Sequence, residues 1–283
     1  MKILVTGYSG QLGYDLVKEG LSQGLEMIGV GSKDLDITDD LAVDYFIARV
    51  KPDGIIHCAA YTAVDKAEEN KEECWRVNVL GSKNLAEAGK KADSKFIYIS
   101  TDYVFDGTSN TPFKECDKAD PINYYGYSKH EGEKVIQSLI AKSFIVRISW
   151  VFGRNGNNFV KTMLRLAETN TEINVVGDQF GSPTYTLDLS KLLIDMIQTD
   201  KYGTYHATNE GFCSWADFAK EIFRLTNKNV RVNAIKTEDY PTKAKRPKNS
   251  RLNKENIIKS GFTPLPRWED SLRHYLKQLN EVD

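Results

Sequence analysis

The stretch from Lys2 to Gly13 constrains the fold of this chain more than any other. Lys2 to Thr6 is a β-branched apolar run that leads into Gly7-Tyr8-Ser9-Gly10-Gln11-Leu12-Gly13, and apolar residues then recur at helical spacing. A strand, a glycine-rich turn and a helix in this order form a phosphate-binding opening, because the helix N-terminus offers free N–H groups. A tight strand-to-helix turn without a ligand is the alternative. We expect dinucleotide contacts from Gly7, Ser9, Gly10, Gln11, Leu12 and Gly13.

The same strand-and-helix rhythm continues to Trp150. Apolar runs at residues 26–30, 53–58, 95–100 and 144–149 alternate with helical patterns ending near Val50, Lys91 and Ala141. This alternation predicts an α/β fold, a Rossmann-type doubly wound parallel sheet. Beyond residue 150 the strands become short and mixed. We therefore predict an NAD(P)-binding domain at 1–150 and a smaller mixed α/β substrate-binding region at 151–283, and leave open whether its segments return to the first domain.

Composition narrows the class of protein. Hydrophobic residues make up 41% and charged residues 27% of the 283 residues, with a net charge of −1. This balance favours neither nucleic acid nor an anionic membrane as a partner. The four cysteines show no C-x-x-C spacing, and we find no signal peptide or membrane-length apolar run. We expect a soluble cytoplasmic protein without disulfides.

Two further strand ends are candidates for cofactor contacts. The second strand ends at Gly31-Ser32-Lys33, without the acidic residue that accepts a ribose 2′-hydroxyl. Ser32 and Lys33 are suited to a 2′-phosphate, so NADPH is compatible, although a plain polar turn explains them as well. The third strand is followed by Ala59-Ala60-Tyr61-Thr62, whose first two small residues leave room for a ligand. His57, inside that strand, is predicted to be a satisfied core histidine.

The segment Tyr125-Gly126-Tyr127-Ser128-Lys129 carries the candidate chemistry. If Asn123 opens a helix, Tyr125 and Lys129 lie one turn apart on one face, where an ammonium lowers the pKa of a phenol. Thr101 follows the 95–100 strand, and its hydroxyl is suited to an oxygen that gains negative charge. Beside a dinucleotide, this set suits carbonyl reduction. A chance Tyr/Lys pair at an exposed helix start is the alternative.

Three other side chains are compatible with either a functional or a structural role. Arg246 lies in a basic loop and is able to pair with a phosphate, but such loops are usually solvated faces. Trp150 follows the last strand of the first domain and reads, without further information, as a core aromatic. Asn78 reads either as a buried hydrogen-bonding residue near the site or as ordinary helix decoration.

Longer motifs give a resemblance to a known family. TGYSGQLG with YGYSK resembles the extended short-chain dehydrogenase/reductases, and further segments resemble, within them, the dTDP-4-dehydrorhamnose reductases. These segments are CAAYTAVDKAE, YISTDYVFDG, SWVFG, GNNFVKTM, DQFGSPTY, RPKNSRL and PRWEDSLRHYL, and they cover almost the whole chain.

The resemblance implies NADPH- or NADH-dependent reduction of the 4-keto group of dTDP-4-dehydro-β-L-rhamnose, the last step of dTDP-rhamnose synthesis. It implies that Tyr125 donates a proton, with Lys129 and Thr101 beside it. The implied cofactor contacts include Gly10, Gln11, Leu12, Asp36, Ile37, Ala60, Tyr61 and Thr62, and the implied substrate contacts are Thr101, Asp102, Trp150 and Asn158, with Arg246 as the phosphate candidate.

Related enzymes with other reactions provide the competing hypotheses. Related dehydratases carry Thr-Asp-Glu where this chain has Thr101-Asp102-Tyr103, and a phenol does not replace that carboxyl as an acid or base. Another nucleotide-sugar reductase, an epimerase and a non-catalytic nucleotide-binding subunit remain alternatives. Some relatives bind Mg²⁺ at a dimer contact, but beyond Asp15 we find no matching acidic set. We therefore assign no metal ligands and leave Mg²⁺ open as an unsupported alternative, and both a monomer and a homodimer are compatible.

Overall fold

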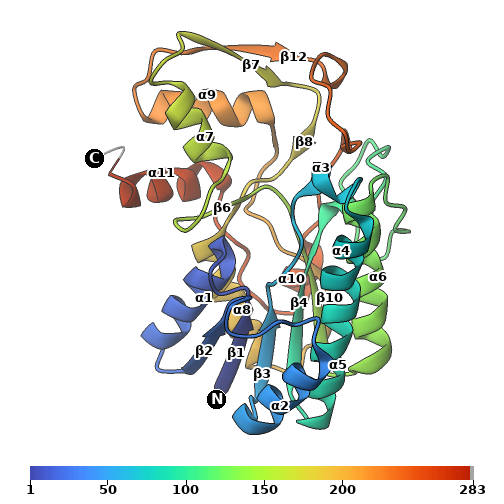
Figure 1. The fold of residues 1–283 in the computed structure, drawn as a ribbon. Helices are drawn as coiled ribbons and strands as arrows, with labels where there is room; N and C mark the ends of the chain where they lie inside the picture. Colours follow the sequence, from blue (N-terminus) through green and yellow to red (C-terminus); the bar gives the residue numbers. More distant parts are fainter. Residues whose placement is uncertain (281–283) are drawn as a thin grey trace.

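A six-stranded parallel sheet forms the centre of the protein. The computed structural model describes residues 1–280, and the strand order in this sheet is β10-β5-β4-β3-β1-β2 (Figure 1). The strands are β1 (Lys2–Thr6), β2 (Glu26–Val30), β3 (Gly54–His57), β4 (Lys95–Thr101), β5 (Ser143–Ile148) and β10 (Gly203–His206). All neighbours pair in parallel, which confirms the predicted doubly wound α/β fold.

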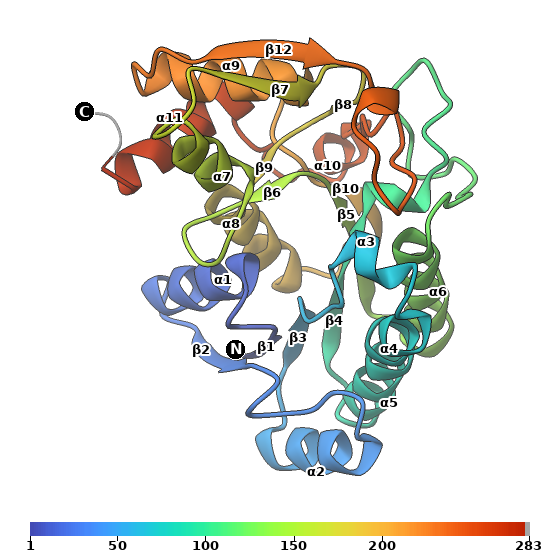
Figure 2. The same ribbon diagram turned by 45° about the horizontal axis from the view of Figure 1, so that its top comes forward.

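Helices cover both faces of this sheet, because its strands are apolar on both sides. The helices are α1 (Gln11–Ser22) and α8 (Thr186–Ile197) on one face and α2 (Asp40–Val50), α5 (Ser82–Lys91) and α6 (Tyr124–Leu139) on the other (Figure 2). Ile3 and Val5 point to the first face and Leu4 to the second, and all three are fully buried. The alternation along β1 therefore fills two separate cores.

A smaller mixed region lies over the carboxyl ends of the strands (Figure 1). It contains α7 (Phe159–Leu166), β7 (Glu172–Val176), α9 (Trp215–Leu225), β12 (Arg231–Ile235) and α11 (Trp268–Gln278). β7 pairs in parallel with β12, and an aromatic core with Phe152, Phe218 and Tyr275 joins the helices. Pairs of two-residue strands complete it, namely β6 (Val151–Phe152) with β9 (Thr184–Tyr185) and β8 (Phe180–Gly181) with β11 (Cys213–Ser214).

Segments beyond residue 150 return to the large sheet. β10 pairs along β5, from Gly203 opposite Phe144 to His206 opposite Arg147. α8 packs against α1, and α10 (Glu255–Lys259) contacts β10. The last strand of the sheet thus comes from the sequence region that also builds the mixed part.

The helical pattern that ends near Lys91 is divided in the structure. α4 (Lys71–Trp75) and α5 are joined by a π-helical segment, Arg76–Gly81, and a short helix α3 (Val64–Ala67) precedes them. A π segment rotates the side chains that follow it, and such segments are frequent at functional sites. Within residues 1–280, no helix combines the length and the apolar character needed to cross a bilayer.

Candidate active site

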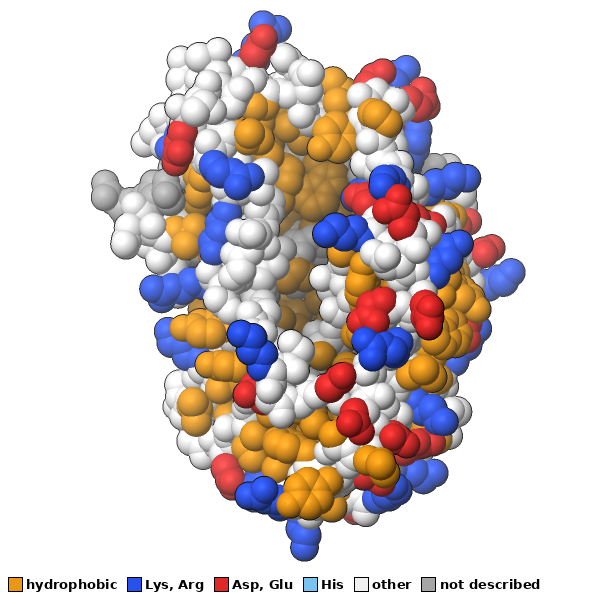
Figure 3. Space-filling view, in the orientation of Figure 1, with side chains coloured by type: hydrophobic (Ala, Val, Ile, Leu, Met, Phe, Trp, Pro, Cys, Tyr) orange, Lys and Arg blue, Asp and Glu red, His pale blue; other side chains and the backbone are white. Residues whose placement is uncertain are grey.

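A cavity of about 850 Å³ opens at the carboxyl ends of β1, β3, β4 and β5, beneath the mixed region. Figure 3 shows this face of the molecule hollowed at its centre. The strand ends bring together the segments that the sequence marked. The lining includes these predicted site residues: Gly7, Ser9, Gly10, Gln11, Leu12, Gly13, Ser32, Asp36, Ile37, Ala59, Ala60, Tyr61, Thr62, Thr101, Asp102, Tyr125, Lys129 and Trp150.

The glycine turn is packed too closely for side chains at its first position. Gly7 has φ +70°, and a Cβ there would lie 2.7 Å from the backbone nitrogen of Ala59. The Gly10 N–H donates to the Gly7 carbonyl at 2.9 Å, and α1 begins directly afterwards. The helix N-terminus has no side-chain cap that would occupy its first N–H groups, and the residues from Gly10 to Gly13 line the cavity. This bare backbone cradle fits the pyrophosphate of a dinucleotide.

Gly7→Ala is expected to raise the Kd for NADPH at least about tenfold, because the turn must shift away from Ala59 to admit the methyl group. Gly24→Ala is the matched control. Gly24 also has a positive φ (+77°), but a Cβ there meets nothing within 4 Å. The left-handed backbone costs each variant about 1–2 kcal/mol of stability, and Gly7→Ala loses more because its methyl group meets backbone atoms. Calorimetric titration should therefore give a higher Kd for NADPH in Gly7→Ala than in Gly24→Ala. Equal Kd values would refute the role of the glycine turn in binding the pyrophosphate.

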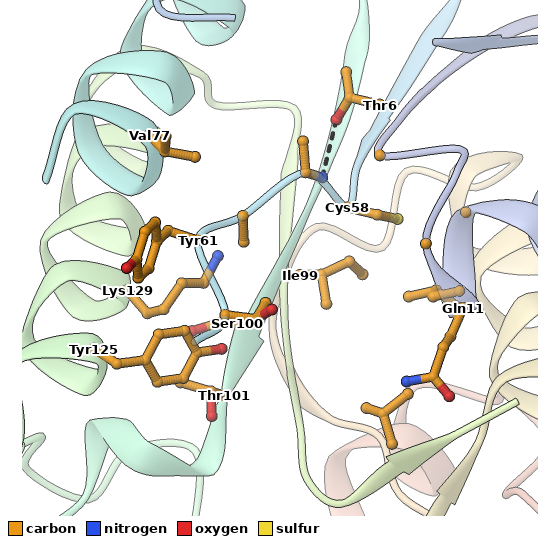
Figure 4. Close-up of a pocket in the computed structure, with 18 of the residues that line it drawn as sticks. Thr6, Gln11, Cys58, Tyr61, Val77, Ile99, Ser100, Thr101, Tyr125 and Lys129 are labelled. Carbon is orange, nitrogen blue, oxygen red and sulfur yellow. Dashed lines mark hydrogen bonds between the residues drawn. The ribbon is translucent and has the colours of Figure 1, made fainter. Parts of the chain in front are cut away.

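Tyr125 and Lys129 lie on one face of α6 and both line the cavity, and the Tyr125 ring points toward Thr101 at the end of β4 (Figure 4). Asn123 opens this helix as predicted, since its side chain accepts a hydrogen bond from the Gly126 N–H at 2.8 Å. Gln11, from the start of α1, faces them across the cavity (Figure 4). The three candidate catalytic side chains therefore share one wall, opposite the glycine turn.

The pKa of Tyr125 differs from the expectation. Burial raises it above the ordinary phenol value, and Asp102 raises it further, while the Thr101 side chain lowers it. The prediction that Lys129 lowers the pKa of Tyr125 is therefore wrong, because the loss of solvation on burial dominates. Tyr125 is consequently a fully protonated phenol near neutral pH.

Lys129 occupies an unusually enclosed position for an ammonium group. Its side chain is 2% exposed, and its Nζ lies 3.9 Å from the centre of the Tyr98 ring, a cation–π contact. Burial lowers the pKa of Lys129 to about 7, and the carboxylate of Glu133, one turn further along α6, opposes this shift. The charge of Lys129 thus depends on a second buried group.

Glu133 is held by Arg147 of β5, and both side chains are nearly inaccessible. Arg147 Nε and Nη2 donate to the two carboxylate oxygens of Glu133 at 2.8 and 2.7 Å, and Ser100 donates a further bond. Burial acts to raise the pKa of Glu133, but these hydrogen bonds lower it to about 2. The pair therefore presents a permanent carboxylate behind Lys129.

Two indoles form the far end of the cavity. Trp150 stacks on Trp215, the first residue of α9, with ring centres 3.6 Å apart. Trp150 adopts φ +48°, rare for a bulky residue, and a Cβ on Gly181 would lie 2.8 Å from its ring. The backbone is thus held in an uncommon conformation that turns the indole into the cavity.

Three predicted site residues lie outside the cavity lining. Asn158 caps α7 and donates to Gln11 Oε1 at 3.1 Å and to Tyr275, so it supports a lining residue from behind. Arg246 forms a two-point ion pair with Asp65 of α3, at 3.2 and 2.8 Å. Lys33 is exposed beside the lining residue Ser32.

Other observations concern residues that the sequence left open or missed. His57 is a satisfied core residue, as predicted, since its ring nitrogens bond to Thr6 and Ser82. Asn78 is buried and bonds both to the backbone N–H of Tyr61 at 2.8 Å and to Ser128 at 2.9 Å, which confirms its hydrogen-bonding role. The lining residues Arg76 and Trp215 were missed, because no local pattern marks a helical residue as cavity-facing.

Potential metal ligands are not gathered at the site. Among residues 1–280, no three or more His, Cys, Asp and Glu side chains are grouped as metal ligands. Asp15, considered from the sequence, is buried and accepts a hydrogen bond from Thr186 of α8. Burial raises the pKa of this carboxyl.

Comparison with known proteins agrees with this geometry. The model of the family described as "RmlD substrate binding domain" matches residues 1–281. The chain is 43% identical to a dTDP-4-dehydrorhamnose reductase of Aggregatibacter actinomycetemcomitans, over 96% of this chain and 97% of that protein.

Two solved structures are similar over nearly their whole length. A dTDP-4-dehydrorhamnose reductase from Clostridium acetobutylicum has 45% identity and a TM-score of 0.97, covering 99% of this chain and 100% of that one. The enzyme from Bacillus anthracis, in complex with NADP, has 42% identity and a TM-score of 0.96, with 98% and 100% coverage. This chain therefore belongs to the RmlD family of NAD(P)H-dependent reductases, the family of the dTDP-4-dehydrorhamnose reductases.

Proposed function

We infer that this protein reduces the 4-keto group of dTDP-4-dehydro-β-L-rhamnose to give dTDP-β-L-rhamnose, with NADPH or NADH as the reductant. One observation carries this inference: Thr101, Tyr125 and Lys129 line one wall of a cavity that also contains a bare glycine cradle. The named activity of relatives at about 40% identity supplies the substrate class.

Each polar group on that wall has a distinct task. The nicotinamide cofactor supplies hydride when bound. Tyr125, whose raised pKa keeps it protonated, donates its proton to the carbonyl oxygen as negative charge develops there. Lys129 lies beside it to bind the ribose hydroxyls of the cofactor. Thr101 offers a hydroxyl for the same carbonyl oxygen.

The two ends of the cavity divide the binding work. The glycine turn, Ser32, Asp36 and the segment from Ala59 to Thr62 line the cofactor end. Trp150 and Trp215 give the sugar end an apolar wall, on which the less polar face of a deoxyhexose packs. Arg246 enters this scheme only if a substrate phosphate replaces Asp65, so we assign it a supporting role in holding the loop against α3.

The decisive assay mixes the protein with NADPH and enzymatically prepared dTDP-4-dehydro-L-rhamnose and follows the loss of absorbance at the reduced-nicotinamide band. We expect stoichiometric oxidation and a product that co-migrates with dTDP-rhamnose. Absence of oxidation at saturating substrate would contradict the proposal. Tightly bound NAD⁺ in the purified protein, with no net consumption of NADPH, would indicate an epimerase instead.

A further inference from the structure

Asp102 is a buried carboxyl that lines the cavity with one oxygen unused. Its side chain is 4% exposed, and its Oδ1 accepts a hydrogen bond from Thr101 Oγ1 at 3.0 Å. Its Oδ2 is buried with no hydrogen-bond partner among residues 1–280, although the Ser250 side chain lies close enough to lower its pKa. An unpaired buried carboxylate oxygen is costly, and this cost falls when the group binds a proton.

Thr101 has only one proton to give. Its hydroxyl donates to Asp102, while its lone pair accepts from the Tyr103 N–H at 3.2 Å. As long as Asp102 is ionised, the single O–H of Thr101 points at that carboxylate. While the Thr101 hydroxyl donates to Asp102, it cannot also donate a hydrogen bond to a substrate oxygen.

We propose that Asp102 controls the direction of the Thr101 hydroxyl: with Asp102 protonated, the Thr101 O–H is free to donate to the substrate carbonyl oxygen, whereas ionised Asp102 withholds it. Asp102 then acts as a positioning residue through Thr101. This inference rests on the proposed reductase function and goes beyond a sugar contact by Asp102. No proton is consumed by the switch during turnover, because Tyr125 supplies the proton that the product keeps.

The surroundings of Asp102 favour such a switch near neutral pH. Burial raises the pKa of Asp102 to about 7, against the lowering effects of Ser250 and Thr101. Tyr103, in the same short 3₁₀ helix (Asp102–Val104), and Tyr125 on α6 face it as neutral phenols, since burial raises the pKa of each. Arg246 is paired with Asp65 beside Tyr103, and Lys129 is a buried cation that also lines the cavity. The pKa of the carboxyl is therefore raised toward the neutral range.

The first experiment needs no substrate. Carboxyl carbons of ¹³C-aspartate-labelled protein are titrated by NMR, and the Asp102 signal is assigned from its loss in Asp102→Asn. We expect a midpoint near pH 7 in the wild type. Thr101→Val should raise that midpoint, because it removes a donor to the carboxylate, and Thr101→Ser should restore it. An Asp102 midpoint that does not change in Thr101→Val would overturn the proposal.

The second experiment measures kcat against pH. Wild-type kcat should fall about tenfold between pH 6 and pH 8, as the protonated fraction of a group with a pKa of about 7 does. Asp102→Asn should have a pH 6 to pH 8 ratio below about twofold, because its amide does not ionise in this range. Thr101→Ser should keep the decline of kcat with pH. In a protein that already carries Thr101→Val, adding Asp102→Asn should not change kcat further.

Two contrary results are distinguishable from failure of the reductase itself. Lys129 also titrates near pH 7, so a decline that survives in Asp102→Asn belongs to Lys129 and refutes the switch. A wild-type kcat that rises from pH 6 to pH 8 shows that ionised Asp102 is the competent form, which equally refutes it. If no NADPH is oxidised at all, the reductase proposal fails, while the NMR titration still decides whether Thr101 donates to Asp102.

Discussion

Tyr125→Phe is expected to lower kcat by about 10²- to 10⁴-fold, the usual contribution of a positioned general acid. The phenyl ring keeps the edge-to-face contact with Tyr103, whose ring centre lies 6.0 Å away, so the cavity wall retains its shape. The Kd for NADPH should therefore change little. The measurement is single-turnover oxidation of NADPH at saturating substrate, with binding measured separately.

Tyr127→Phe provides the matched control for that variant. Tyr127 lies on the same helix, but it is 42% exposed and stacks on Trp75 outside the cavity lining. Its kcat should stay within about twofold of the wild type. Equal turnover in Tyr125→Phe and Tyr127→Phe would remove Tyr125 from the mechanism, even if NADPH oxidation itself is confirmed.

Glu133→Ala is expected to reduce the free energy of unfolding by about 3–5 kcal/mol, because it leaves the Arg147 guanidinium buried without its counter-charge. Lys134→Ala removes an exposed ion pair with Glu131 from the same helix and should cost less than about 0.5 kcal/mol. Urea unfolding at pH 7 measures both. Similar losses in the two variants would show that the buried pair contributes no more than a surface pair.

The pH dependence of the Glu133 contribution follows from the direction of its shift. Its pKa is about 2 in the folded protein, below the ordinary value of 4.5, so the ionised form is bound more favourably in the native state. The stabilisation is therefore present above about pH 4.5 and is lost as the pH falls toward 2. In Glu133→Ala, the free energy of unfolding should therefore decrease less between pH 4.5 and pH 2 than it does in the wild type. Its Lys129 should also titrate at lower pH, since the carboxylate that opposes burial is gone.

The sequence predicted most of the fold because its information is local. Apolar runs with period-two or helical spacing mark strands and helices directly, and the carboxyl ends of parallel strands must meet at one edge. That reasoning placed Thr101, Tyr125 and the glycine turn in one cavity. The π segment at Arg76–Gly81 escaped it, because a single i→i+5 turn has no distinct apolar period.

The parts that sequence reasoning did not reach depend on distant partners. Arg246 was a candidate for phosphate, but its partner Asp65 is far away along the chain, and only the folded loop brings the two together. Likewise, the shift in the pKa of Tyr125 depends on how completely the neighbouring segments exclude water. A spacing of four residues predicts the proximity of a charge and not the solvation that opposes it.

The position of β10 has a consequence for how the chain folds as it is synthesised. β5 lies between β4 and β10, so it remains an open edge until Gly203–His206 have been made and docked. A nascent chain that has emerged only to Trp150 carries Tyr125 and the glycine turn on an unfinished sheet. The final hydrogen-bonded ladder forms between residues about sixty apart in sequence, a non-local closure that folds slowly. The six-stranded sheet is thus completed by β10, a strand made late in translation.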